Sequence, residues 1–124
     1  SGEPPVPVYD LGIVLNNLLT NAVEACAGVP QDQRFIKLTS KTKGQFLLIE
    51  TTNPFVGTIE TDPDGLPRSS KPGTDIERHG YGLRNVKEIA KRYLGDVTFR
   101  TEDHTASVTV MLQKVSETKP SPGA

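Results

Sequence analysis

The feature that most constrains the fold is a run of apolar residues spaced three and four apart near the start of the chain. On a helix with 3.6 residues per turn, this spacing places the run on one face. Asp10 is expected to cap the helix, and Gly28 and Pro30 are expected to end it. The run consists of Leu11, Val14, Leu15, Leu18, Leu19, Ala22, Val23 and Cys26.

A β-hairpin and a long loop are expected after this helix. Residues 35–40 and 45–52 are rich in β-prone residues and are joined by a turn that contains Gly44. Residues 53–82 contain four prolines and few large apolar residues. A loop of this length within a compact domain is usually functional or disordered.

A second helix and a second hairpin are expected after the loop. The helical spacing resumes at Leu83 and continues to Tyr93, with Gly95 as the expected end. Residues 97–101 and 107–113 alternate as two more strands. This order predicts an α+β fold, a two-layer sandwich in which a mixed, mostly antiparallel sheet is covered on one face by helices.

The composition fits a single folded domain, which we expect over residues 3–114. The 124 residues are 35% hydrophobic, and 14 Lys and Arg against 15 Asp and Glu give a formal charge of -1, so no basic field favours nucleic acid. No apolar run approaches the ~18 to 20 residues of a membrane span.

The single Cys26 is expected to pack in the core. Residues 1–2 resemble a tag remnant and 115–124 a disordered tail, so we expect a piece of a longer protein.

Two asparagines lie beside the apolar face of the first helix. Asn17 and Asn21 are poor helix formers, and they share a polar band with Asp10 and Glu24. Two amide oxygens four residues apart can hold Mg²⁺ or its waters, with phosphate oxygens completing the coordination. A solvated helix face would produce the same pattern, and from the spacing alone it is the simpler interpretation.

A second motif, His79-Gly80-Tyr81-Gly82-Leu83, stands where the loop is expected to meet the second helix. Glycines allow the backbone to approach a ligand, and the free N–H groups and dipole of a helix N-terminus attract phosphate. A hinge before a helix explains an isolated Gly-x-Gly equally well.

Together the two motifs resemble the ATP-binding domain of the gyrase, chaperone, histidine kinase and mismatch-repair superfamily. Residues 16–25 (NNLLTNAVEA) look like its N box, residues 79–93 like its second glycine box with the following helix, and residues 94–112 like its terminal hairpin. The resemblance covers residues 8–112. Because Ser70-Lys71 precedes the glycine motif, the chain is most similar to bacterial sensor histidine kinases of the peptide quorum-sensing receptor type.

This resemblance implies a site for ATP and Mg²⁺. Asn21 would ligate the Mg²⁺ that bridges the ATP phosphates, and Asn17 would lie beside the same phosphates. Lys71 would contact phosphate. The glycine motif would complete the cofactor-binding residues: Gly80 and Gly82 through backbone room and N–H donors, together with His79, Tyr81 and Leu83.

Asn17 also bears on the expected reaction. The hydrolysing chaperone and repair members carry a glutamate, the general base for water, four residues before the metal-binding asparagine, whereas this chain has Asn17. An amide cannot accept a proton at neutral pH, so attack by water is not promoted. This difference favours phosphoryl transfer to a histidine and argues against a chaperone or repair ATPase.

The chain departs from the superfamily at the adenine site. The usual Asp-x-Gly-x-Gly box is missing, and Asn53-Pro54-Phe55 stands at the end of the second expected strand. Asn53 could accept a hydrogen bond from the adenine amino group without a charge, although asparagine also commonly ends strands. The competing segment 62–65 (DPDG) lies past the strand and is interpreted as a plain turn. The role of Glu24 is left open.

Neither histidine has the helical setting of a phosphoacceptor, because His79 lies in the glycine motif and His104 is interpreted as an exposed turn residue. The resemblance to sensor histidine kinases implies that the phosphoacceptor lies on a separate dimerisation domain of a membrane-bound bacterial receptor. The ATP-binding domain would lie on the cytoplasmic side of the membrane and act together with a response regulator. By itself it would be monomeric. Two alternatives stay open: an anti-sigma-factor type serine kinase, and a degenerate domain that has lost nucleotide binding.

Overall fold

A computed structural model describes residues 6–68 and 75–114, with the backbone alone for residues 75–81. The expected tag remnant, the expected tail and Lys71 lie outside the described residues. The elements in chain order are helix α1 (Val8–Cys26), the 3-10 turn η1 (Gln31–Gln33), strands β1 (Lys37–Lys43) and β2 (Phe46–Pro54), helix α2 (Asp75–Arg92), and strands β3 (Asp96–Glu102) and β4 (Thr105–Gln113).

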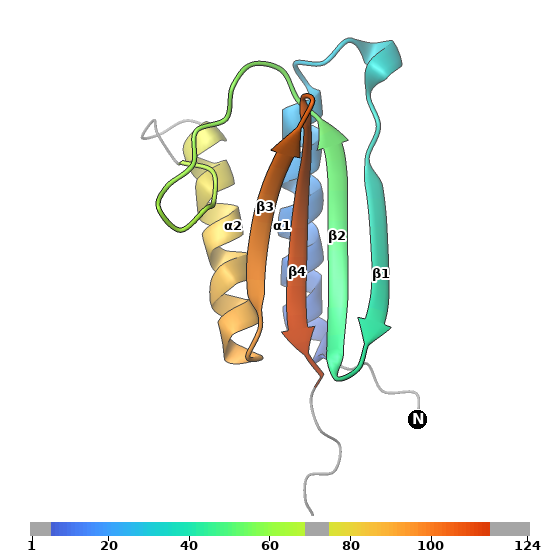
Figure 1. Ribbon diagram of the computed structural model, residues 1–124, viewed down its shortest axis with the longest axis vertical. Coiled ribbons are helices and arrows are strands. Elements are labelled where there is room, and N and C mark those ends of the chain that lie inside the picture. Colours follow the sequence, from blue (N-terminus) through green and yellow to red (C-terminus); the bar gives the residue numbers. More distant parts are fainter. Residues whose placement is uncertain (1–5, 69–74, 115–124) are drawn as a thin grey trace, which may run out of the picture.

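The strands form one sheet in the order β1-β2-β4-β3, and both helices lie on the same face of it (Figure 1). This arrangement confirms the predicted α+β fold with two layers. The sheet was expected to be mixed and mostly antiparallel. In the described part of the chain all three strand pairs are antiparallel. Two of the pairs are hairpins, and in the third the start of β2 lies beside the end of β4.

The core lies between the helices and the inner face of β2 and β4. Alternate residues of these strands are buried, as the period of two along a strand requires. In β4 the buried residues are Ala106, Val108, Val110 and Leu112. The helices contribute buried residues at helical spacing, which are Val14, Leu18, Ala22 and Cys26 of α1 and Leu83, Val86, Ile89 and Ala90 of α2.

Cys26 is buried, as expected, and its thiol lies 3.4 Å from the carbonyl oxygen of Phe35. Strand β1 is exposed along its whole length at the edge of the sheet. Lysines at Lys37, Lys41 and Lys43 line this edge, and lysines on an edge strand discourage pairing with another chain. None of the described helices combines the length and the apolar character that crossing a membrane requires.

The N-terminus of α1 differs from the prediction. The helix begins at Val8 with Pro7 at the N-cap position, so Asp10 lies inside the first turn and the prediction that it caps the helix is wrong. The Asp10 carboxylate instead accepts a hydrogen bond from the hydroxyl of Tyr93, and it lies 3.9 Å from Nη1 of Arg92. These contacts join the start of α1 to the end of α2.

The loop is shorter than predicted at both ends. Asn53 and Pro54 belong to β2, and α2 begins at Asp75 and not near Leu83. Residues 75–82 contain no proline, so no residue of this stretch prevents the backbone from continuing as a helix. The sequence prediction placed the helix start too late because this stretch lacks the apolar spacing that marks the rest of α2.

The described part of the loop, residues 55–68, is anchored by Leu66, which is 1% exposed and belongs to the core cluster. The segment 62–65 is a turn, as interpreted from the sequence: the N–H of Gly65 donates to the carbonyl of Asp62 at 2.8 Å. Gly65 has a φ of 86°, which favours glycine. The N–H of Arg68 donates to the carbonyl of Glu60 at 2.8 Å, which closes this small hairpin-like loop.

Replacing Tyr93 by Phe should lower the free energy of unfolding by about 1 kcal/mol, because the carboxylate of Asp10, whose side chain is 14% exposed, would lose its hydrogen bond. Urea denaturation measures the change. The hydrogen bond to Asp10 raises the pKa of Tyr93 above its ordinary value of 10.0. Because the folded-state pKa is raised, this stabilisation is fully present below the ordinary pKa of the tyrosine hydroxyl. It is lost as the pH rises through the folded-state pKa.

The matched control is Tyr9→Phe, since Tyr9 is 79% exposed and has no hydrogen bond to a described residue. We expect this variant to be as stable as the parent. Equal stability of the two variants would contradict the assigned role of Tyr93.

Candidate functional site

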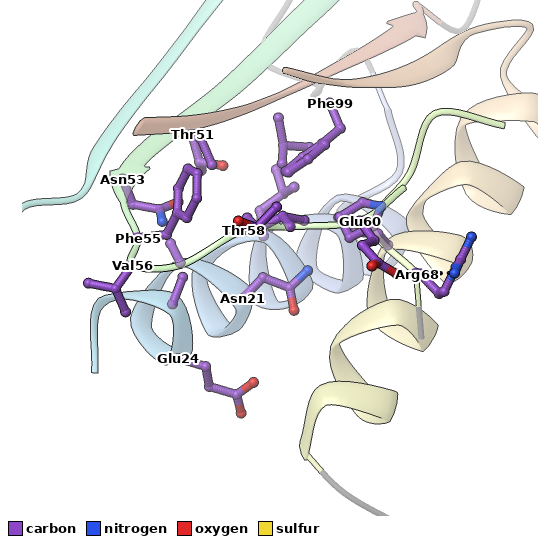
Figure 2. Close-up of a pocket in the computed structure, with 18 residues that line it drawn as sticks. Asn21, Glu24, Thr51, Asn53, Phe55, Val56, Thr58, Glu60, Arg68 and Phe99 are labelled. Atoms are coloured by element: carbon purple, nitrogen blue, oxygen red, sulfur yellow. Dashed lines mark hydrogen bonds and ion pairs between the residues drawn. The ribbon is translucent and has the colours of Figure 1, made fainter. Parts of the chain in front are cut away.

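A cavity of about 550 Å³ lies between α1, the inner face of the sheet and the loop 55–68. Figure 2 shows the loop running across the cavity between the sheet and α1. Asn21, Ala22, Glu24 and Ala25 line it from α1, Thr51, Asn53, Phe99, Ala106 and Val108 from the sheet, and Phe55, Val56, Thr58, Glu60 and Arg68 from the loop. The cavity therefore combines an apolar interior with a few polar side chains, as ligand sites usually do.

Asn21 lies in the wall of this cavity beside two residues of the core. Leu18 and Ala22 of the same helix face are 1% and 2% exposed, so the helix packing carries Asn21 to the edge of the core. The side-chain Nδ2 of Asn21 is buried and has no hydrogen-bond partner among the described residues. Because a buried, unpaired donor costs about 1–3 kcal/mol, the site suits a ligand that presents an acceptor here.

Asn17 lies one turn earlier, and it does not line the cavity. Its Nδ2 donates to the carbonyl of Ile13 at 2.9 Å, which fixes the carboxamide. Its Oδ1 lies close to Gly82 of α2: a Cβ added to Gly82 would lie 2.8 Å from this oxygen and 3.6 Å from Oδ1 of Asn21. The structure thus brings both asparagines together with the last glycine of the second motif.

The glycine motif is placed differently from the prediction. It lies inside α2, several residues after the helix start at Asp75, so the N–H groups of Gly80 and Gly82 are not among the free N–H groups of the first turn. The prediction that these glycines open the helix is therefore wrong. What Gly82 provides is a close approach of α2 to α1, since a side chain here would displace Asn17.

The other residues of this motif are described to different extents. Leu83 is buried and lines the cavity. For His79, Gly80 and Tyr81 the structure describes only the backbone, which is helical. Their predicted contacts with a nucleotide, like that of Lys71, stay predictions.

Asn53 belongs to the sheet and lines the cavity. It occupies an inner position at the end of β2, is 6% exposed and stands opposite the small Ala106. Its Nδ2 donates to the carbonyl of Pro54 at 2.9 Å, and its Oδ1 accepts no hydrogen bond from any described residue. Asn53 is thus a buried wall residue with an available acceptor and not a solvated strand end.

Thr51 is a wall residue that sequence reasoning missed. It precedes Asn53 by two residues, so both side chains point to the inner face of the sheet, and it is 1% exposed. The alternation of the strand could have identified it once Asn53 was placed on the inner face.

His104 is exposed at its turn, as interpreted, but it also supports the cavity wall. Its carbonyl accepts a hydrogen bond from the N–H of Phe55 at 3.0 Å, and the two rings lie 5.6 Å apart. These contacts hold Phe55 where the loop leaves β2.

Ion pairs fasten the loop to α2. Nη1 of Arg84 lies 3.0 Å from Oδ2 of Asp64, and Nη2 of Arg84 donates to Asp62. The N–H of Leu66 donates to Asp64 and lowers its pKa; Arg84 and Lys87 act in the same direction, while partial burial opposes them. The segment interpreted as a plain turn therefore has a second role, which only the tertiary contacts reveal.

The sequence of this chain matches the GHKL domain family over residues 6–113. No curated protein matches the chain. The match spans both helices and all four strands, and it includes the cavity and every described residue that lines it. The chain therefore belongs to the GHKL domain family.

Proposed function

We propose that this GHKL domain binds ATP with Mg²⁺ and acts as the catalytic domain of a sensor histidine kinase. It would donate the γ-phosphoryl group to a histidine on a dimerisation domain outside this chain. The observation that carries the proposal is the buried, unpaired Nδ2 of Asn21 in the wall of the cavity. Membership of the GHKL family supports ATP as the ligand.

Different residues along the cavity suit different parts of a nucleotide. Asn53 offers its Oδ1 to an amino group of the base, and Phe55 and Val56 supply apolar surface beside it. Asn21 lies between this end and α2 in Figure 2. The cavity thus offers a polar group for the edge of a base at Asn53 and another for phosphates at Asn21.

Asn21 would hold Mg²⁺ through its amide oxygen, with Asn17 beside the same phosphates, and a side chain at position 82 would meet both carboxamides. The bound ion would supply neutralisation of phosphate charge. Among the described residues no three His, Cys, Asp or Glu gather closely enough to hold a metal ion. An ion in this site would therefore also need oxygens from the nucleotide and from water.

Asn17 supports a kinase over an ATPase. Its amide lies where hydrolysing relatives have a glutamate, and its Nδ2 is already bonded to Ile13. An amide cannot take a proton from water, so Asn17 does not act as a general base. The resemblance to sensor histidine kinases supplies the proposed partners: a dimerisation domain that presents histidine, and a response regulator, in a membrane-bound receptor with this domain on the cytoplasmic side.

One observation favours a second candidate, a degenerate domain that keeps the fold without binding nucleotide. Asn53 stands where relatives carry an aspartate, and a neutral acceptor forms a weaker hydrogen bond than a carboxylate. A serine kinase of the same fold would share the whole site and would differ only in the residue that it phosphorylates. Transfer of phosphate to a histidine domain or to a serine substrate separates those two kinases.

Calorimetric titration with Mg²⁺ and ADP, or with a non-hydrolysable ATP analogue, tests binding directly. We expect saturable binding by the parent and a loss of tenfold or more, on the order of 1.5–3 kcal/mol, for Asn21→Ala, because an amide that contacts charged groups is removed. Asn16→Ala is the matched control: it is an exposed asparagine of the same helix.

Two results would contradict the proposal. The first is no binding by the parent up to millimolar nucleotide, which would favour the degenerate domain. The second is equal binding by the parent and Asn21→Ala, which would place the nucleotide elsewhere.

Gly82→Ala tests the contact between the two motifs. The added Cβ would force the Asn17 carboxamide from its place, so nucleotide affinity should fall severalfold. The free energy of unfolding should change little, because alanine gains about 1 kcal/mol over glycine in a helix and offsets the displacement. Gly12→Ala, which has open space around it on α1, should keep the parent affinity and gain stability. If the two variants bind nucleotide equally well, Gly82 has no role in the site.

A further inference from the structure

The loop wall of the cavity carries a positive charge that neither sequence motif indicated. Among the described residues that line the cavity, Arg68 is the one lysine or arginine, while Glu24 and Glu60 are acidic. The phosphates of a nucleotide are anionic, and the planar guanidinium group is well suited to bind them. The way in which Arg68 is held therefore matters for the ligand.

Two carboxylates hold the Arg68 side chain in place. Its Nε lies 3.1 Å from Oδ1 of Asp62, and its Nη1 lies 3.1 Å from Oε1 of Glu60. A guanidinium has five N–H donors, and Nη2 of Arg68 makes no hydrogen bond with the described part of the protein. The side chain is thus oriented, 49% exposed, and able to donate to an anion.

A second arginine holds this arrangement from α2. Oδ1 of Asp62 binds Arg68, and Oδ2 of Asp62 binds Arg84, whose other nitrogen lies 3.0 Å from Asp64. Nζ of Lys87 lies 4.0 Å from Oδ2 of Asp64, the oxygen that Arg84 also contacts. Three positive and three negative side chains meet here, so the cluster has no net negative charge that would repel an anion.

Two members of this cluster, Glu60 and Arg68, line the cavity. Figure 2 shows Asn53 at one end, Glu60 and Arg68 at the other end beside α2, and Asn21 between them. Arg84 follows Leu83, the last residue of the glycine motif, directly in the chain.

We propose that Arg68 binds the phosphate groups of the nucleotide, and that Arg84 is a positioning residue that holds Arg68 through Asp62. This inference rests on the proposed nucleotide site and adds a ligand-binding residue to it. It differs from a purely structural role of the ion pairs, because a phosphate contact affects nucleotides and leaves nucleosides unaffected.

The test compares ADP with adenosine, each titrated with Mg²⁺ present and followed by NMR, which also measures weak nucleoside binding. Arg68→Gln should lower the affinity for ADP about tenfold, because a charge-assisted hydrogen bond is lost, and should leave the affinity for adenosine unchanged. Arg100→Gln is the matched control: Arg100 forms an exposed ion pair with Glu50 at 3.2 Å and does not line the cavity. Its ADP affinity should equal that of the parent.

The positioning role of Arg84 is tested in the same titration. Arg84→Gln should lower the ADP affinity by about threefold, and Arg84→Lys should restore little of it, since a lysine does not reproduce the two-pronged contact with Asp62 and Asp64. In the double variant with Arg68→Gln, the loss should equal that of Arg68→Gln alone, because Arg84 acts through Arg68. Urea denaturation confirms that each variant is folded.

The outcomes distinguish the inference from the function on which it rests. A parent that binds neither ADP nor adenosine overturns both. If the parent binds and Arg68→Gln weakens ADP and adenosine equally, Arg68 only supports the wall, and the phosphate contact is overturned. Additive losses in the double variant overturn the positioning role of Arg84.

Discussion

The structure depends on the packing of α1 against α2 and against the inner face of β2. Leu18 and Ala22 are almost fully buried in this contact, which determines the rotation of the helix about its axis. With this rotation, Asn21 must lie at the edge of the core, where its Nδ2 is buried without a partner in the described structure. The same packing that stabilises the domain therefore places its most distinctive polar group in the cavity wall.

The cavity exists because the residues at this end of the core are small or polar. Along the inner face of β2, Leu47 and Ile49 give way to Thr51 and Asn53, and β4 contributes only Ala106 opposite Asn53. These side chains are too small to fill the space up to the helix layer. The loop 55–68 crosses this space, and its ion pairs to α2 hold it there. Membership of the GHKL family fits a nucleotide in the resulting space.

Periodic burial made much of the fold predictable, because α1, most of α2 and the inner strands β2 and β4 bury residues with the period of their element. The edge strand β1 has no buried residue. What depends on distant partners was not predictable. Asp10 meets Tyr93 across 83 residues, so no local signal reveals that it is not a cap. The start of α2 lacked apolar spacing. Asn21 and Asn53 were predicted as site residues from the family resemblance, and both line the cavity. The ion pairs of Arg68 and Arg84 arise only from contacts between loop and helix, which no local pattern indicates.

The proposed function depends on a contact between Asn21 and a nucleotide in this cavity. The most direct measurement is the side-chain amide signal of Asn21 in ¹⁵N NMR spectra, assigned by its absence in Asn21→Ala, during titration with Mg²⁺ and ADP. A nucleotide bound at Asn21 should produce a saturable shift of this signal as its buried Nδ2 gains a partner, with no shift of the exposed Asn16 amide. An unchanged Asn21 signal at saturating ADP would contradict it.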